Sequence, residues 1–290
     1  MQIRGFSLCC NPVLDTIIYL LALVALLGLA GIMLYMGMVA LFYQLEAGSI
    51  QAGGGNGWKR LYRPRKLPLH QLSTLHQKFS YYKRLPAYYQ QRFETRMVHV
   101  LKKLQFEGRD GLVVTEEMRI LVAACMVKLT FGYRLYHITG FNKVILYPDA
   151  FYSRFTKSQN KGETHAAGFV VLSWKDTLAG LAIEDDNLHL VLHEFAHALY
   201  LSHMRELGVD QRFSLHWPMW LKYVQHIGNM NKLRTTGFFR EYAYTNQAEL
   251  FACIVEAFFE SPLKFNEKHP VLFRIMSMLL NQHPLKLKQK

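Results

Sequence analysis

The chain has 290 residues, of which 51% are hydrophobic, and it carries a formal net charge of +13. This length allows one or two domains with a sizeable core. The sequence contains four cysteines, at positions 9, 10, 125 and 253. They form no visible disulfide framework, which argues against a small disulfide-stabilised secreted domain. Cys125 and Cys253 lie in apolar helical patterns and are expected to be plain buried residues.

After a short N-terminal segment, residues 1–15, the first predicted element is an apolar segment at residues 16–45. It contains 30 residues without a charge, whereas a membrane-spanning helix needs about 20. A secretory signal peptide, the alternative, has a shorter apolar core followed by a small-residue cleavage site. We therefore predict a single transmembrane helix over this segment.

Residues 46–70 are predicted to form a linker that is first rich in glycine and then basic. Only Arg4 precedes the apolar segment, whereas several cations follow it: Lys59, Arg60, Arg63, Arg65 and Lys66. The positive-inside rule therefore places the C-terminal portion in the cytoplasm.

Residues 51–105 form a basic stretch, with 12 Lys or Arg and one acid, Glu94. Beside a membrane span, such a stretch favours contact with anionic lipid headgroups. Nucleic-acid binding is the alternative, and it is disfavoured because no nucleic-acid-binding motif accompanies the charge.

Residues 71–290 are predicted to fold as one domain. A helical period runs over residues 88–103, and Thr115 is a suitable cap for a helix that continues to residue 129. Residues 143–147 and 168–174 are typical of strands and could form a small sheet whose edge pairs with an extended substrate. The rest is predicted to be helical, with breaks near Gly208, Pro218, Gly237 and Pro262.

The most specific motif is HEFAH at residues 193–197. Residues four apart share one face of a helix, so His193 and His197 can bind the same metal ion. Glu194 then lies beside the metal, where a carboxylate can take a proton from metal-bound water. The acidic residues 185–187 suit the start of this helix. A chance match is the alternative, because the chain contains 13 histidines.

A catalytic zinc site needs a third protein ligand and an open position for water. His203 has the spacing of a known zinc motif, but Tyr200 replaces the glycine that would turn the chain back. On a continuing helix His203 would point about 240° away from His197. The other candidate is Glu249, seven residues before Glu256 on one face of an apolar helix.

A carboxylate in that apolar setting must be paired or bind a metal, which makes Glu249 the preferred third ligand. Glu256 is expected to lie behind the ligands, orienting a histidine or holding the helix. An ordinary exposed glutamate is the alternative.

Four segments together resemble the MtfA-type peptidases, the Mlc titration factor A family: FEGRDGLVVTEEMRILVAA (106–124), VVLSW (170–174), VLHEFAHAL (191–199) and EYAYTNQAELFACIVEAFFESP (241–262). The resemblance implies a zincin-type fold, one zinc ion (Zn2+) and peptidase activity. It implies that His193, His197 and Glu249 are zinc ligands and that Glu194 is the general base. It also implies that Tyr242 stabilises the oxyanion.

The chain departs from the family pattern in several places. Ala198 and Tyr200 replace a Lys and an Asp, and residues 240–242 read Arg-Glu-Tyr where the family has Asp-Pro-Tyr. The predicted membrane span and basic linker are additions.

These observations predict an α+β, helix-dominated zincin-like fold with a small β-sheet, preceded by one transmembrane helix. They favour a single-pass, membrane-anchored zinc peptidase that acts on a peptide or protein substrate, and the resemblance makes aminopeptidase action plausible. The alternative is a membrane-tethered, zinc-containing binding module that sequesters a cytoplasmic regulator. An intact Glu194 favours the enzyme, because a structural zinc needs no base.

Overall fold

A computed structural model describes residues 20–38 and 66–286. The chain divides into two compact units, Met1–Arg63 and Pro64–Lys290. In the first unit Leu20–Met38 is a 19-residue helix that is long and apolar enough, by length and composition, to cross a membrane. The flanking parts of the predicted span, residues 16–19 and 39–45, and most of the predicted linker lie outside the described residues.

The second unit is dominated by helices and contains a small sheet, as predicted. Its elements are α2 (Leu69–Lys78), α3 (Ser80–Lys83), α4 (Ala87–Lys103), β1 (Gln105–Gly108), α5 (Glu116–Thr130), β2 (Lys143–Tyr147), β3 (Phe151–Ser153), β4 (Ser158–Asn160), β5 (Gly162–His165), β6 (Phe169–Ser173), α6 (Trp174–Ala182), α7 (Leu190–Met204), α8 (Gln211–Gln225), α9 (Ile227–Thr235), η2 (Glu241–Tyr244), α10 (Gln247–Glu260), α11 (Pro262–Lys268), α12 (Pro270–Leu279) and η3 (Pro284–Lys286). The helix predicted at residues 88–103 is confirmed as α4, and the two predicted strands are confirmed as β2 and β6.

The main sheet has four strands in the order β1-β2-β6-β5. β1, β2 and β6 are parallel, whereas β5 runs antiparallel to β6. Val144 and Leu146 on β2 and Val170 and Leu172 on β6 are buried, because β-branched and aliphatic side chains pack well on a pleated surface. Because β5 is last in the strand order, it is an edge strand, and it packs against α7.

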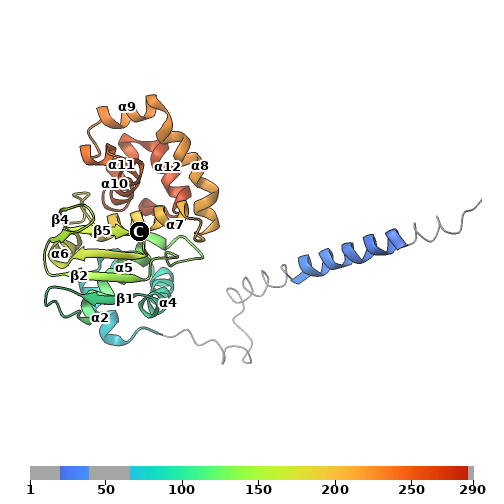
Figure 1. Cartoon of the computed structure of the whole chain (residues 1–290), viewed down its shortest axis with the longest axis horizontal. Coiled ribbons are helices and arrows are strands. Elements are labelled where there is room, and N and C mark those ends of the chain that lie inside the picture. The colour runs from blue at the N-terminus through green and yellow to red at the C-terminus, as the bar shows by residue number, and fades with distance from the viewer. Residues whose placement is uncertain (1–19, 39–65, 287–290) are drawn as a thin grey trace, which may run out of the picture. The chain divides into compact units, whose positions relative to one another are not determined.

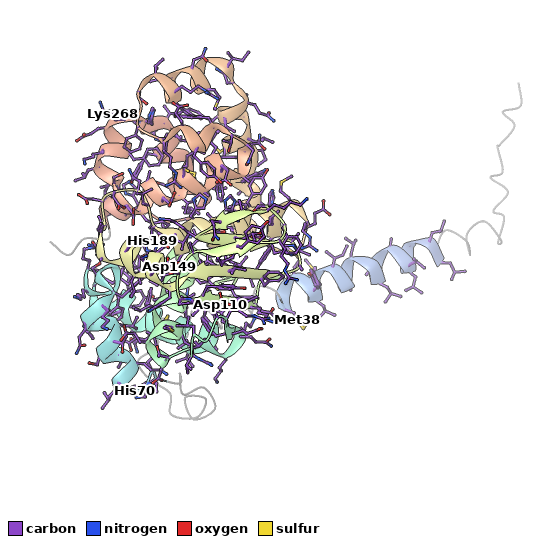
Figure 2. The ribbon with its side chains drawn as sticks, turned by 60° about the vertical axis from the view of Figure 1, so that its left-hand side comes forward. Met38, His70, Asp110, Asp149, His189 and Lys268 are labelled. Carbon is purple, nitrogen blue, oxygen red and sulfur yellow. The ribbon has the colours of Figure 1, made fainter. Side chains whose placement is uncertain are left out.

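Helix α7 is central to the second unit. Figure 1 shows the sheet with α2 and α4 below α7, and α8 to α12 above it. α7 contacts α5, α6, α10, β5 and β6. His189, the residue before α7, is buried, and Figure 2 shows it between His70 and Lys268, which lie toward opposite ends of the unit. Side chains on α7 can therefore contact groups from the sheet and from α10.

Helix α5 provides much of the core below α7. Thr115 caps it as predicted, since its hydroxyl accepts a hydrogen bond from the Met118 backbone N–H at 3.3 Å. From Ile120 to Thr130 every residue of α5 is buried. A helix that is buried on all sides belongs at the centre of a domain rather than at its surface.

The predicted start of the motif helix is wrong by several residues. α7 begins at Leu190, and His189 caps it by accepting a hydrogen bond from the Leu192 N–H at 3.4 Å. The side chain of Asp186 instead binds the Leu188 N–H, and Asn187 has a φ of 59°. A left-handed residue cannot continue a helix, so residues 185–188 form a loop.

The predicted break at Pro218 is also wrong, because Pro218 lies inside α8. Trp217 and Trp220 flank it, and their rings stack at 4.6 Å in the interior. This packing offsets the backbone hydrogen bond that proline cannot make.

Part of the basic stretch is used within the fold. Arg96 is buried and donates hydrogen bonds to the backbone carbonyls of Thr130, Phe131 and Tyr133 at the end of α5. Lys78 and Arg84 form ion pairs with acidic side chains. These three cations are therefore less available for lipid headgroups than the sequence suggests.

Candidate metal centre

Three polar side chains from two packed helices converge on one point. His193 and His197 lie one turn apart on α7, and their Nε2 atoms are 3.0 Å apart. Glu249 comes from the first turn of α10, which Asn246 caps. Its Oε2 is 3.1 Å from the Nε2 of His193 and 3.3 Å from that of His197.

These separations fit a tetrahedral zinc ion. Ligand bonds of about 2.0–2.1 Å in tetrahedral geometry hold neighbouring donor atoms about 3.4 Å apart. The donor atoms observed here are 3.0–3.3 Å apart. Two histidines and a glutamate are also a donor set used by catalytic zinc sites, which leave the fourth position open. Burial raises the pKa of Glu249, but the hydrogen bonds to the two histidines and the charges of those histidines together outweigh burial and hold that pKa well below its ordinary value.

Glu256 lies behind His193, two turns beyond Glu249 on α10. Its side chain is buried, and its Oε2 is 3.1 Å from the Nδ1 of His193. A carboxylate at Nδ1 favours the tautomer whose Nε2 is free to bind a metal. Burial lowers the pKa of His193, but hydrogen bonds to Cys253, Glu249 and Glu256 outweigh it and raise that pKa.

A second group of donors, His193, Cys253 and Glu256, also lies within 4.8 Å. It shares His193 with the first group and lies on the Nδ1 side of that ring. The guanidinium of Arg240 is 2.8 Å from Glu256, so a cation already compensates this carboxylate. This arrangement argues against a second metal ion.

Glu194 points toward the edge strand β5. The Thr164 hydroxyl is 2.8 Å from the Oε2 of Glu194, and a Cβ added at Gly162 would lie 2.5 Å from its Oε1. Glu194 is only 5% exposed, and this burial raises the pKa of its carboxyl, against the opposing charges of the two histidines. A raised pKa makes the carboxyl a stronger base, which favours its taking up a proton.

Tyr242 is carried by the short helix η2 and is half-exposed. Its partial burial, the charge of Glu249 and a hydrogen bond with that carboxylate together raise the pKa of Tyr242 to about 12. The phenol therefore stays protonated near neutral pH and can donate a hydrogen bond at the cluster. Thus the structure brings the predicted site residues together: His193, Glu194, His197, Tyr242, Glu249 and Glu256.

His203 takes no part in this cluster. Its ring, in the last turn of α7, packs 5.2 Å from Phe213 and 4.8 Å from Trp217, measured between ring centroids. It is an aromatic packing residue, neither a ligand nor a fully solvent-facing side chain.

Three site residues were not identified from sequence. Gly162 and Thr164 lie on a strand whose sequence, GETH, lacks an apolar alternation. Arg240 was visible only as a departure from the family pattern, although its guanidinium contacts both Glu256 and His193.

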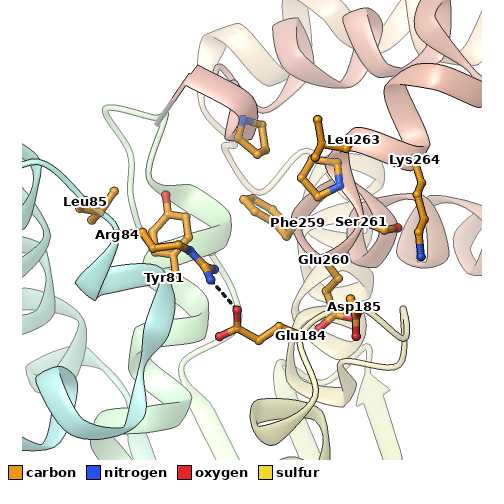
Figure 3. A pocket seen from close by; sticks show the side chains of 12 residues that line it. Tyr81, Arg84, Leu85, Glu184, Asp185, Phe259, Glu260, Ser261, Leu263 and Lys264 are labelled. Carbon is orange, nitrogen blue, oxygen red and sulfur yellow. Dashed lines mark hydrogen bonds and ion pairs between the residues drawn. The ribbon is translucent and has the colours of Figure 1, made fainter. Parts of the chain in front are cut away.

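A pocket of about 420 Å³ lies away from the donor cluster. Figure 3 shows it between α3, the loop after α6 and the α10–α11 junction, with an ion pair between Arg84 and Glu184 in its wall. None of the metal-donor residues lines it. The donor cluster on α7 and α10 is therefore separate from this pocket.

Comparison with known proteins gives a consistent picture. The family model for the glucose-regulated metallo-peptidase M90 matches residues 56–280. The protein slr2042 of Synechocystis sp. is 26% identical over 246 residues, covering 78% of this chain and 88% of that protein. Mlc titration factor A of Serratia proteamaculans is 25% identical over 218 residues, covering 68% of this chain and 81% of that protein. Mlc titration factor A of Yersinia pestis (strain Pestoides F) is also 25% identical over 218 residues, covering 68% of this chain and 78% of that protein. These matches confirm the resemblance drawn from the four sequence segments.

Proposed function

Since this chain belongs to the glucose-regulated metallo-peptidase M90 family, we propose that it is a zinc-dependent peptidase whose active site lies between α7 and α10. The convergence of the two imidazoles and the Glu249 carboxylate at 3.0–3.3 Å carries this proposal. In it, His193, His197 and Glu249 hold one zinc ion. When bound, zinc would lower the pKa of a water molecule and polarise the substrate carbonyl.

The proton transfers are assigned to Glu194. Its carboxylate accepts a proton from the attacking water and later donates that proton to the leaving amine. Thr164 holds Oε2 by a 2.8 Å hydrogen bond, so Oε1 is the oxygen proposed to take the proton. Burial of Glu194 supports this role, because it raises the pKa of the carboxyl and so makes it a better proton acceptor.

Tyr242 and β5 are assigned to the substrate. The Tyr242 hydroxyl donates a hydrogen bond to the negative charge that develops on the carbonyl oxygen. β5 pairs with β6 on one side, and its other edge is proposed to bind an extended peptide through main-chain hydrogen bonds. We propose that the peptidase acts as an aminopeptidase. Paired substrates with free and acetylated amino termini test this, because only internal cleavage would accept both.

The decisive variant is Glu194→Gln in the full chain. The amide cannot accept the proton, so cleavage of a mixed peptide pool should fall by about 10²–10⁴-fold, while bound zinc remains stoichiometric. His197→Ala is the matched control and should lose both zinc and cleavage. Cleavage by Glu194→Gln at the wild-type rate would rule out this mechanism.

A second function is suggested by the relatives named Mlc titration factor A, whose name describes titration of another factor. In this alternative the chain is a membrane-tethered binding module for a cytoplasmic regulator. Stoichiometric zinc in the wild type, with no cleavage of any peptide in the pool, would favour it.

The proposed location is a single-pass membrane protein. Leu20–Met38 is the proposed anchor, and its length and hydropathy support it. The cations that follow the apolar segment support a peptidase unit on the cytoplasmic side.

A further inference from the structure

We propose that Arg240 is a positioning residue that holds both a zinc-ligand histidine and the tyrosine of the oxyanion site. The inference rests on the proposed function, because it concerns the same cluster of residues. Among the described contacts, Arg240 Nη2 lies 3.1 Å from the Nδ1 of His193, and none joins Arg240 to the donor atoms of Glu249 or His197. It acts through the groups that it binds.

The first of these groups is Glu256. Arg240 donates a hydrogen bond from Nη2 to the Oε2 of Glu256 at 2.8 Å, and the same oxygen is 3.1 Å from the Nδ1 of His193. Glu256 is only 1% exposed. A buried carboxylate needs hydrogen-bond and charge partners, and the guanidinium of Arg240 provides both. Arg240 therefore holds the Glu256 carboxylate in place beside the Nδ1 of His193.

The second group is the loop before α7. The Nη1 of Arg240 donates to the backbone carbonyl of Asn187 at 3.1 Å. That loop is itself fixed, since the hydroxyl of Ser261 donates to the Oδ1 of Asn187 at 2.6 Å. A planar guanidinium can make these two bonds in fixed directions, whereas an ammonium cannot reproduce the fork.

The third group is the turn that carries Tyr242. Arg240 immediately precedes η2, and its Cζ lies 5.9 Å from the centroid of the Tyr242 ring. One side chain therefore connects the start of α7, the middle of α10 and the oxyanion tyrosine.

The test measures zinc affinity of the full chain in detergent, by competition with a chelator of known affinity. Arg240→Ala should weaken zinc binding by about 10–100-fold, the usual effect of removing a group that orients a ligand. Arg240→Lys should recover most of this affinity, because an ammonium can still pair with Glu256. The kcat of Arg240→Lys should nevertheless stay below that of the wild type, with little change in KM, because the ammonium cannot also hold the carbonyl of Asn187.

Arg234→Ala is the matched control. Arg234 stacks on Tyr244 of the same turn at 4.5 Å, and no described contact joins it to the metal donors. It should leave zinc affinity and kcat unchanged. In a double-mutant cycle, Arg240→Ala combined with Glu256→Gln should weaken zinc little more than Glu256→Gln alone, because both changes remove one connected interaction.

The inference is overturned if Arg240→Ala binds zinc within about twofold of the wild type, or if the two losses in the cycle simply add. If Arg240→Ala does not fold, Arg240→Lys decides, since wild-type affinity and wild-type kcat in that variant overturn it as well. A wild type that binds zinc and cleaves nothing refutes the proposed function, while the zinc measurements still decide the role of Arg240. A wild type that binds no zinc refutes both.

Discussion

At the scale of single residues, Tyr242 combines a half-exposed ring with a pKa of about 12, because partial burial, the charge of Glu249 and a hydrogen bond with it all favour the neutral phenol. Tyr242→Phe removes the donor and keeps the ring. We expect kcat to fall by about 10²-fold with zinc content unchanged, as for other single oxyanion donors. Tyr244→Phe on the same turn is the control, and an equal loss in both variants would contradict a specific role for Tyr242.

His189 gives a prediction about stability. It is buried, and this burial, reinforced by the charge of Lys128, holds its pKa well below 6.5. The unfolded chain therefore binds a proton on this histidine at a higher pH than the folded chain does. The stability that depends on a neutral His189 is therefore fully present above pH 6.5, and it is lost as the pH falls below that value.

We expect the free energy of unfolding to decrease on acidification by up to about 1.4 kcal/mol per pH unit from this group alone. His189→Asn keeps a side chain that can cap α7 and does not titrate, so its loss between pH 7 and pH 5 should be smaller. Urea denaturation at both pH values measures the difference. Equal losses in the wild type and the variant would show that His189 is not the titrating group.

At the scale of elements, β5 and α7 together form the surroundings of the proposed base. A Cβ at Gly162 would lie 2.5 Å from the Oε1 of Glu194 and 2.7 Å from the Cδ1 of Leu190, so Gly162→Ala must displace both side chains or the strand itself. We expect at least about a tenfold loss of kcat, since a displacement of 1 Å at an active site can cost 10²-fold. Zinc stoichiometry should be retained.

Thr164 tests the same contact from the other side. Thr164→Val removes the hydroxyl that bonds Glu194 and should lower kcat, whereas Thr164→Ser keeps it and should not. Wild-type kcat in both Gly162→Ala and Thr164→Val would exclude a role of β5 in holding the base.

The same elements show what sequence can predict. The HEFAH spacing encodes a geometry within one helix, so His193, Glu194 and His197 could be placed from sequence. β5 could not, because GETH has no strand pattern and its extended form depends on pairing with β6. Arg240 likewise has no local signature, since its partners come from α7, α10 and the preceding loop through tertiary packing.

At the scale of the whole molecule, the two units have different compositions. The described helix of the first unit, Leu20–Met38, has none of its apolar window buried inside the structure. The second unit contains the sheet, the helical core and every residue of the proposed zinc site. The sequence predicts an apolar segment followed by a folded domain, because an uninterrupted apolar segment differs from the amphipathic patterns that follow it.

We therefore expect residues 64–290 to fold without the first unit, to remain soluble without detergent and to bind zinc with the affinity of the full chain. The full chain should instead sediment with membranes and resist extraction at high salt, because apolar burial in a bilayer is insensitive to ionic strength. The measurement compares zinc affinity, thermal unfolding and membrane fractionation of the two proteins. Release of the full chain by salt alone would indicate that surface cations, and not the apolar helix, attach it to the membrane. An aggregated or zinc-free second unit would instead show that the first unit contributes to the fold itself.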